Sequence, residues 1–233
     1  MVNIFYQPRI GDGVLYLDDE ESRHCIKVLR HKIGDSIRLT DGKGNFYDAI
    51  ITGDSFRQCE FELTNASPVE PLTYSVHIAI SPTKNADRIE WFVEKCVEIG
   101  VDKISLVNCE HTERTFIKSE RLTKIAVSAM KQSIKASLPF IAGPIDLLPF
   151  ITGADETHRY MAHVDAENEA VLQRVAPLGG KYLILIGPEG DFSPRELAVA
   201  REHKFTKVSL GPSRLRTETA GLVACHILNL INQ

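Results

Sequence analysis

Two glycine-containing loops near the C-terminus have the residue types and spacing of a binding site for a small polar ligand. The first runs over 186–192 with Gly187 and Gly190, and the second over 210–220 with Gly211. Each follows a short apolar run typical of a β-strand and precedes a helical pattern. A strand end, a glycine turn and a helix N-terminus place free backbone N–H groups around a ligand. We therefore expect the loops to form two walls of one cofactor pocket at the carboxyl edge of a parallel sheet.

The late position of these loops argues against the two common nucleotide-binding motifs. The first strand of the α/β region is followed by 81–84, Ser-Pro-Thr-Lys, which contains no glycine. The dinucleotide fingerprint of a Rossmann-like domain is therefore missing from the place where it belongs. Neither late loop ends in Gly-Lys-Ser/Thr, so a Walker-type phosphate loop is missing too.

The elements that must position the loops begin at Tyr74, where apolar runs start to alternate with helical patterns. We expect strands at 76–80, 104–107, 140–145, 160–164, 182–186 and 207–210. We expect helices at 87–99, 119–136, 167–175, 194–203 and 219–231. Strands that are apolar without strict alternation, each followed by a helix, indicate a parallel sheet covered on both faces.

Residues 1–70 predict a different, all-β unit. Short strands are expected at 14–17, 36–40, 45–52 and 59–63, with a hairpin turn at 41–44 and one helix between about residues 18 and 34. Several short strands with tight turns indicate a small barrel. The two prolines of 67–71 predict an inter-domain linker, because proline disfavours both a helix and a central strand. The sequence therefore predicts two domains, 1–70 and 73–233.

The composition restricts the class of protein. With 43% hydrophobic and 25% charged residues in a chain of 233, it is that of a soluble globular protein. No apolar run approaches the ~18 residues of a membrane span, and the first nine residues do not form a signal peptide. The five cysteines are scattered without a Cys-x-x-Cys pair. Reduced thiols in a cytoplasmic protein, without a metal site, are therefore expected.

The formal net charge of −4 does not by itself predict a nucleic-acid partner. Residues 1–72 hold eight basic and twelve acidic side chains, but 111–140 holds six basic side chains against Glu113 and Glu120. A local basic face can bind phosphate on an acidic protein, because screening confines the interaction to roughly 10 Å. A solvated helix face has the same pattern, so both interpretations stay open at this point.

Several motifs, in the same order and over nearly the whole chain, resemble the ribosomal RNA small subunit methyltransferase E family of the SPOUT superfamily. They are the two late loops, 24–30 (His-Cys-Ile-Lys-Val-Leu-Arg) with Gly34-Asp35, Lys84 with Arg88 and Glu90, 95–101, Arg114, and Gln132-Ser133 with Pro139. Three positions depart from the commonest family pattern. Lys131 replaces glutamate, Lys135 replaces arginine and Asp191 replaces glycine. The two lysines keep or raise positive charge, so we expect activity to be retained.

The resemblance implies a fold and a cofactor. The fold is a PUA-like β-barrel at 1–70 and a SPOUT domain at 73–233, whose last strands and helix form a deep trefoil knot. The cofactor is S-adenosylmethionine, with its adenine held by backbone groups of the two loops. The glycines allow close approach of the main chain, although they could instead only close tight turns. The implied contacts are His163, Ile186, Gly187, Pro188, Glu189, Gly190, Leu210, Gly211, Leu215, Arg216, Thr217, Thr219 and Ala220. His163, at a predicted strand end, either lines the pocket or supports the fold.

The resemblance also implies a reaction, methylation at N3 of a uridine in 16S rRNA. Since N3 carries a proton, the anion must be favoured, and a positive side chain near the uracil oxygens would stabilise it. The candidates for this role or for phosphate contacts are Arg216, Arg114, Lys84 and Arg30. Glu218 or Glu189 is a candidate proton acceptor, but each is equally suited to hold a loop N–H or to pair with an arginine.

The implied partners are 16S rRNA, within the small ribosomal subunit, and a second copy of the chain. The expected RNA contacts are Arg9, Arg23, Lys27, Arg30, Lys84, Lys131, Gln132 and Lys135. Helix 219–231 has more apolar surface than one core-facing stripe needs, which indicates either a homodimer interface or full burial. A non-enzymatic RNA-binding or ribosome-assembly protein is the alternative function, and the intact second loop counts against it.

Overall fold

The computed structural model describes residues 3–113, 115, 117–163 and 170–233, in two compact units. The N-terminal unit comprises Met1–Pro71 with Val127–Leu138, and the C-terminal unit comprises Leu72–Ala126 with Pro139–Gln233. The candidate Arg114 lies outside the described residues, as do residues 164–169, which include the end of one expected strand and the start of one expected helix.

The C-terminal unit is built on a six-stranded sheet in the order β10-β8-β9-β5-β6-β7, with every neighbouring pair parallel. The strands are β5 (Tyr74–Ile80), β6 (Lys103–Asn108), β7 (Phe140–Asp146), β8 (His158–Ala162), β9 (Gly180–Ile186) and β10 (Thr206–Val208). Residues 182–186 of β9 are buried throughout, which explains their unbroken apolar run. The predicted parallel sheet is confirmed.

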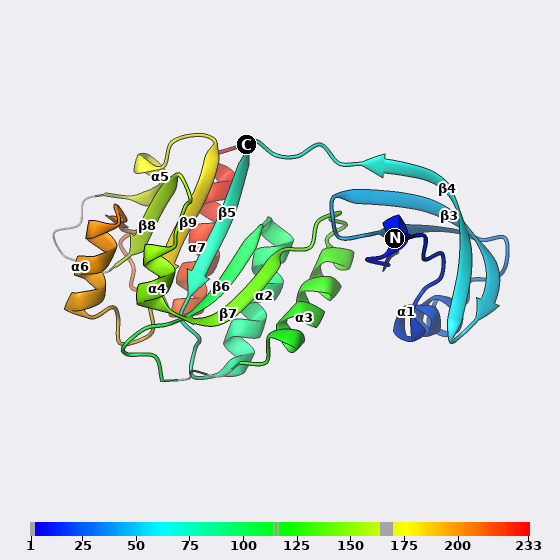
Figure 1. The fold of residues 1–233 in the computed structure, drawn as a ribbon, viewed down its shortest axis with the longest axis horizontal. Coiled ribbons are helices and arrows are strands. Elements are labelled where there is room, and N and C mark those ends of the chain that lie inside the picture. Colours follow the sequence, from blue (N-terminus) through cyan, green and yellow to red (C-terminus); the bar gives the residue numbers. More distant parts are fainter. Residues whose placement is uncertain (1–2, 114, 116, 164–169) are drawn as a thin grey trace. The chain divides into compact units, whose positions relative to one another are not determined.

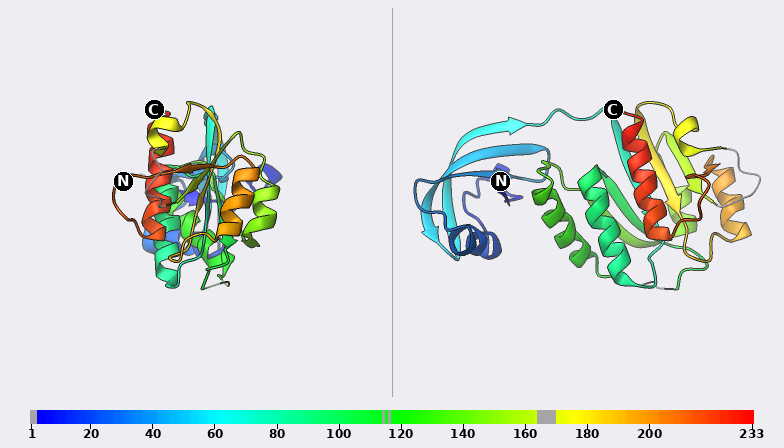
Figure 2. Two further views of the ribbon diagram at one scale, coloured as in Figure 1. Left: turned by 90° about the vertical axis from the view of Figure 1, so that its left-hand side faces the viewer. Right: turned by 180° about the vertical axis from the view of Figure 1, so that it is seen from behind.

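Helices cover both faces of this sheet. The helices that follow the strands along the chain are α2 (Ala86–Ile99), α3 (Ser119–Gln132), α4 (Leu147–Thr152), α5 (Leu172–Val175), α6 (Pro194–Glu202) and α7 (Thr217–Leu230). Figure 2 shows α2 and α7 side by side on one face, with α4 and α6 on the other. The expected helix 119–136 ends earlier, at Gln132, and Ile134 beyond it has a φ of 56°, which a right-handed helix cannot contain. The sequence missed α4, a six-residue helix that contains Pro149.

Helix α7 packs closely on α2 because it has a glycine at the contact. A Cβ at Gly221 would lie 2.5 Å from Cε2 of Phe92 and 3.1 Å from Cδ1 of Ile80. Both neighbours are fully buried, so neither has free space to move into.

We therefore expect Gly221→Ala to destabilise the protein by about 1–3 kcal/mol through overpacking. Helix propensity alone predicts the opposite, a gain of about 1 kcal/mol. Urea unfolding of the variant and the wild type measures the sign of the difference. A more stable variant would contradict the close packing of α7 on α2.

The N-terminal unit contains a four-stranded sheet in the order β1-β2-β3-β4 (Figure 1). Its strands are β1 (Ile4–Tyr6), β2 (Ser36–Thr40), β3 (Asn45–Ser55) and β4 (Gln58–Pro68), and helix α1 (Asp19–Arg23) continues into a π-helical turn (His24–Val28). A small barrel was predicted; among the described residues no pairing joins β4 to β1, so the strands do not close into a complete ring. The predicted strand 14–17 is reduced to one bridge, between Tyr16 and Glu60, and β1 was not predicted.

The predicted linker 67–71 is wrong in its first two residues, because β4 extends to Pro68. Since β4 lies at the edge of its sheet, a residue without an N–H group is tolerated there. The N-terminal unit also includes Val127–Leu138, a segment that was predicted to belong to the C-terminal domain. The carbonyl of Ala136 accepts a hydrogen bond from Oγ1 of Thr40 at 3.0 Å, and Lys131 Nζ forms an ion pair with Glu21.

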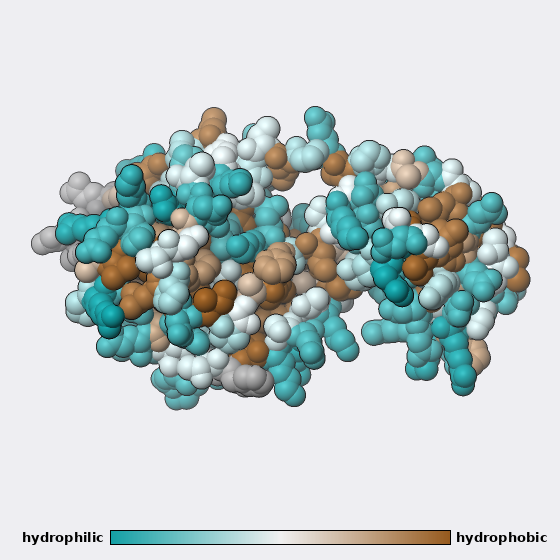
Figure 3. Space-filling view, in the orientation of Figure 1, coloured by the Kyte–Doolittle hydropathy of each residue, from teal (hydrophilic) through white to brown (hydrophobic). Residues whose placement is uncertain are grey.

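The surface and the cysteines fit a globular chain. Hydrophilic side chains dominate the face in Figure 3, where apolar residues gather in separate patches. Within the described parts of the chain, no helix has the length and apolar character needed to cross a bilayer. The same residues contain no group of three or more His, Cys, Asp or Glu side chains placed to hold a metal ion. All five cysteines are free and buried.

Candidate functional site

The two late loops form one cavity of about 860 Å³ in the C-terminal unit. It lies at the carboxyl ends of β8, β9 and β10, where ligands bind in open parallel sheets. Of the predicted cofactor contacts, the lining includes His163, Ile186, Gly187, Pro188, Glu189, Leu210, Gly211, Leu215, Arg216, Thr217 and Ala220. Gly190 and Thr219 are not in the lining. Asp191, Pro212, Ser213 and Arg214 also line the cavity; they lie within the two predicted loops but were not among the named contacts. Ala162, Val208 and Ser209 lie outside those loops and were missed.

Hydrogen bonds join the two loops to each other and stabilise the turn of the second loop. Oγ1 of Thr217, the first residue of α7, donates to the carbonyl of Gly187 at 3.2 Å. The Ser209 hydroxyl both accepts from the Gly211 N–H at 3.2 Å and donates to the Gly211 carbonyl at 3.0 Å. The two walls are therefore preorganised, which lowers the entropic cost of ligand binding.

The glycines of the loops are required for different physical reasons. Gly211 has a φ of 130°, which side chains with a Cβ rarely adopt, and an added Cβ would meet nothing within 4 Å. Gly187 has an ordinary φ, but a Cβ there would lie 3.0 Å from the ring of Phe192. Glycine is therefore required at position 211 by the backbone conformation of the loop. At position 187 it is required by the close packing of the loop against Phe192.

Asp191 holds the first loop to the end of β8. One of its carboxylate oxygens lies 3.0 Å from Nδ1 of His163, and Oδ1 accepts from the Phe192 N–H at 2.8 Å. Its φ of 61° is left-handed, a conformation that aspartate tolerates better than most residues. The sequence placed Asp191 within the predicted loop 186–192 but did not predict its contact with His163.

His111, in the loop after β6, also contacts the first loop. Its Nδ1 lies 3.0 Å from the carbonyl of Asp191 and 3.1 Å from that of Gly190. The bond to the Asp191 carbonyl is the main cause of a raised pKa for His111. A Cβ at Gly190 would lie 3.1 Å from Cβ of His111. Gly190 therefore serves the contact with His111, although it was predicted as a cofactor contact.

A histidine whose pKa is raised in the folded protein adds stability that is full below its ordinary pKa of 6.5 and is lost as pH rises through the folded value. We expect His111→Ala to lower Tm more at about pH 5.5 than at about pH 8.5. Differential scanning fluorimetry across this range measures the difference between the two proteins. His203→Ala, in a half-buried histidine at the end of α6, is the control. An equal loss of Tm at both pH values would contradict the charge-assisted contact.

Only some of the predicted catalytic residues line the cavity. Arg216 is exposed, precedes α7 and lines the cavity. Glu189 lines it too, but Glu218 does not. The side chain of Glu218 is only 9% exposed, and its Oε1 lies 3.8 Å from Nε of Arg88 on α2. Its Oε2 has no hydrogen-bond partner among the described residues.

The predicted RNA contacts are also dispersed. Arg9, Arg23, Lys27 and Arg30 are exposed on the N-terminal unit. Within this set, Arg23 pairs with Asp19 at 2.7 Å, and Lys27 Nζ lies 4.0 Å from the ring centroid of Phe56. The remaining four were Lys84, Lys131, Gln132 and Lys135.

Two of these four residues, both lysines, form ion pairs. Lys84 pairs with Glu113 at 2.9 Å, and this carboxylate raises the pKa of Lys84. Lys131 is largely buried against Glu21, which favours a structural role for it over RNA contact. Gln132 is exposed and Lys135 is half-buried.

Comparison with known proteins assigns the chain to a family. The family described as an RNA methyltransferase domain matches residues 70–229, and the RNA methyltransferase PUA domain matches residues 17–64. The chain belongs to the RNA methyltransferase family. Its resemblance to the ribosomal RNA small subunit methyltransferase E proteins is confirmed as well. The protein of that name from Rickettsia conorii is 27% identical over 98% of this chain and 95% of its own length.

Solved structures of this family have the same fold. A probable rRNA-methyltransferase from Porphyromonas gingivalis is 45% identical, with a TM-score of 0.91 over 98% of this chain and 99% of that one. The ribosomal RNA small subunit methyltransferase E from Neisseria gonorrhoeae is 26% identical, with a TM-score of 0.84 over 100% of this chain and 98% of that one. The Neisseria structure was solved with S-adenosyl methionine bound. A parallel α/β sheet with an N-terminal PUA domain is therefore the shared architecture.

Proposed function

We propose that this protein methylates N3 of a uridine in 16S rRNA of the small ribosomal subunit, with S-adenosylmethionine as methyl donor. The observation that carries the proposal is the cavity of about 860 Å³ between the two late loops. The cofactor-bound relative from Neisseria supports the choice of ligand, and the rRNA methyltransferase relatives support the choice of substrate.

The residues of the cavity fit this cofactor. Its volume lies within the roughly 300–1,000 Å³ of small-molecule sites. Ile186, Leu210 and Leu215 offer apolar walls for an adenine ring, and the backbone groups around Gly187 and Gly211 offer hydrogen bonds. The carboxylate of Asp191 is available to a cationic or hydroxyl group. The bound cofactor supplies an electrophilic methyl group.

The side chains of the protein position the base and control its charge. Arg216, the residue immediately before the first turn of α7, is placed to stabilise the uracil anion, as a preorganised donor stabilises an oxyanion. We assign Glu189, which lines the cavity, as the better candidate proton acceptor than Glu218, which faces Arg88. Arg114 stays a candidate that lies outside the described residues.

The proposal extends to topology and assembly. We propose that the chain after β9 is threaded into a trefoil knot. The placement of β10 beyond β8, followed by the return of α7 onto α2, supports this proposal. We further propose a cytoplasmic homodimer, in which residues 1–70 bind RNA and residues 73–233 bind the cofactor. On α7, Leu222, Val223 and Ile227 are half-buried and Leu230 is 46% exposed, so one apolar stripe of this helix is available to a second copy.

Two measurements test the activity. Calorimetric titration with S-adenosylmethionine should show binding at one site per chain, and a nicotinamide dinucleotide should show none. Mass spectrometry of 16S rRNA nucleosides should show that N3-methyluridine is lost when the gene is deleted and restored when it is returned. Unchanged N3-methyluridine in the deletion strain would favour the alternative of a non-enzymatic RNA-binding protein.

A further inference from the structure

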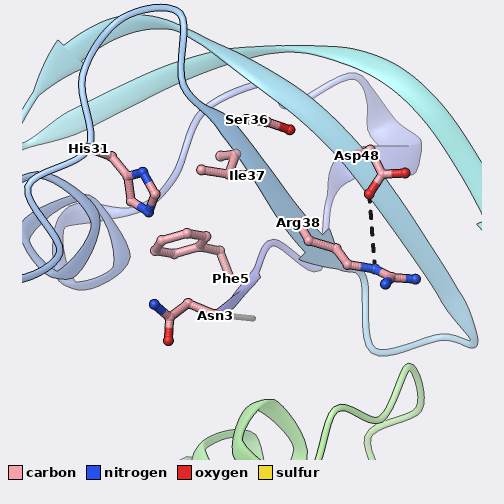
Figure 4. A pocket seen from close by; sticks show the side chains of 7 residues that line it. All are labelled: Asn3, Phe5, His31, Ser36, Ile37, Arg38 and Asp48. Atoms are coloured by element: carbon pink, nitrogen blue, oxygen red, sulfur yellow. Dashed lines mark ion pairs between the residues drawn. The ribbon is translucent and has the colours of Figure 1, made fainter. Parts of the chain in front are cut away.

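A second cavity, of about 380 Å³, lies wholly within the N-terminal unit. Figure 4 shows its seven lining side chains, which come from β1 and the residue before it, from β2 and β3, and from the loop before β2. They are Asn3, Phe5, His31, Ser36, Ile37, Arg38 and Asp48. The volume falls within the roughly 300–1,000 Å³ of small-molecule sites, and none of the sequence motifs pointed to it.

The cavity has an apolar floor and a polar rim. Phe5 and Ile37 are buried and form the floor, while the ring of His31 meets that of Phe5 at 6.2 Å between centroids, edge to face. Arg38 and Asp48 stand side by side on the rim, because they are register partners on the antiparallel strands β2 and β3. A β-bulge in the pairing of β3 with β4 begins at Asp48, and bulges commonly redirect the side chains beside them.

The Arg38–Asp48 pair leaves hydrogen-bonding capacity unused. Nε of Arg38 lies 4.0 Å from Oδ1 of Asp48 (dashed line in Figure 4), too far for a hydrogen bond. Among the described residues this buried Nε has no hydrogen-bond partner. The guanidinium is nevertheless held in place, because its Cζ lies 4.6 Å from the ring centroid of Phe46. Oδ2 of Asp48 accepts one long hydrogen bond, from Nδ2 of Asn65 at 3.4 Å, and each carboxylate oxygen can accept a second. Both side chains are over two-fifths exposed, so a ligand can reach their remaining polar atoms.

This chemistry suits a nucleobase better than a phosphate. A phosphate beside Arg38 would also lie beside the carboxylate of Asp48, which would repel it. A base instead needs donors and acceptors next to each other, with an apolar floor below its ring. Unpaired RNA bases are recognised in this way, through hydrogen bonds to their edges and contacts to their faces.

Among the four bases, guanine matches the rim. Its N1–H and N2–H are adjacent donors that pair with the two oxygens of one carboxylate, here Asp48. The neighbouring O6 accepts from a guanidinium, here Arg38. Uracil has one ring donor, and in adenine and cytosine the amino group is adjacent to an acceptor, which a carboxylate repels.

We propose that this cavity binds one unpaired guanine base of an RNA substrate. The choice of RNA over a free guanine nucleotide rests on the proposed function. The cavity gives the N-terminal unit a means of reading sequence, whereas its exposed arginines and lysines contact the backbone without reading it.

The test compares two single-stranded heptaribonucleotides by fluorescence anisotropy with the full-length protein. One has a central guanine flanked by uridines and the other a central adenine. We expect the guanine oligonucleotide to bind at least about fivefold more tightly. Asp48→Asn should abolish this preference without weakening the adenine oligonucleotide, and a duplex that pairs the guanine should lose the preference too.

Asp54→Asn is the matched control, since it makes the same change at an exposed position of the same strand. It should keep the guanine preference, and calorimetry with S-adenosylmethionine should give the same affinity for both variants. Loss of the preference with intact cofactor binding in the Asp48 variant separates this proposal from the proposed function.

Three results would overturn the proposal. Equal affinity of the wild type for the two oligonucleotides would rule out guanine recognition. Tighter binding of both oligonucleotides by the folded Asp48→Asn variant would assign the cavity to phosphate. Free guanosine monophosphate binding as tightly as the oligonucleotide would overturn the assignment to RNA.

Discussion

Gly211→Ala is expected to weaken the binding of S-adenosylmethionine by roughly tenfold to a hundredfold. The φ of 130° at Gly211 is strained for alanine, at a cost of order 1–3 kcal/mol. Free protein can relax this strain by shifting the loop, but the bound state must restore the loop conformation. The strain energy is therefore lost from the binding free energy, and each 1.4 kcal/mol is a factor of ten. Calorimetric titration measures the dissociation constant directly.

Gly187→Ala provides a useful contrast on the other wall of the same cavity. Its Cβ would lie 3.0–3.3 Å from the ring of Phe192, which is buried in the core. We expect this variant to lower stability as well as affinity, whereas Gly211→Ala should lower affinity with little change in Tm. Gly11→Ala, at a glycine with an ordinary φ and open space, should change neither quantity. Unchanged affinity in a folded Gly211→Ala protein would show that the second loop is not part of the ligand site.

The general architecture could be predicted from the sequence because it depends on local patterns. The apolar runs of β5 and β9, and the glycine turns that follow β9 and β10, predict a parallel sheet with a ligand site at its carboxyl edge. Both loops line one cavity, as expected. The N-terminal sheet was predicted less well, since β1 has three residues and no distinctive pattern. The guanine cavity was missed for that reason, because Asn3 and Phe5 form one of its walls.

The contacts that organise the site are long-range and could not be predicted. His111 meets the Asp191 carbonyl across 80 residues of sequence, and Asp191 meets His163 across 28. The direction of Glu218, in contrast, follows from helix geometry. Thr217 and Ala220 line the cavity, and they are three residues apart on one face of α7. Glu218 is turned by about 100° from Thr217, toward Arg88, so its position could have been derived from the sequence.

The second large effect is expected for Arg216→Ala. The guanidinium of Arg216 lines the cavity at the start of α7 and is exposed. In the proposed reaction it stabilises negative charge on the uracil ring, and removal of one such preorganised donor costs about 10²–10³-fold in kcat. Because this charge develops on the base and not on the cofactor, affinity for S-adenosylmethionine should change little. Single-turnover methylation of 16S rRNA and calorimetry together separate the two effects.

Two further variants decide what Arg216 contributes. Arg216→Lys keeps the charge but loses the planar fork of donors, so partial recovery of kcat indicates that charge matters most. Arg201→Ala, in the last turn of α6 and away from the cavity, should leave kcat unchanged. If Arg216→Ala instead weakens S-adenosylmethionine binding by the full factor and leaves kcat intact, Arg216 holds the cofactor. The anion would then have to be stabilised by another cation, and Arg114 would be the first to test.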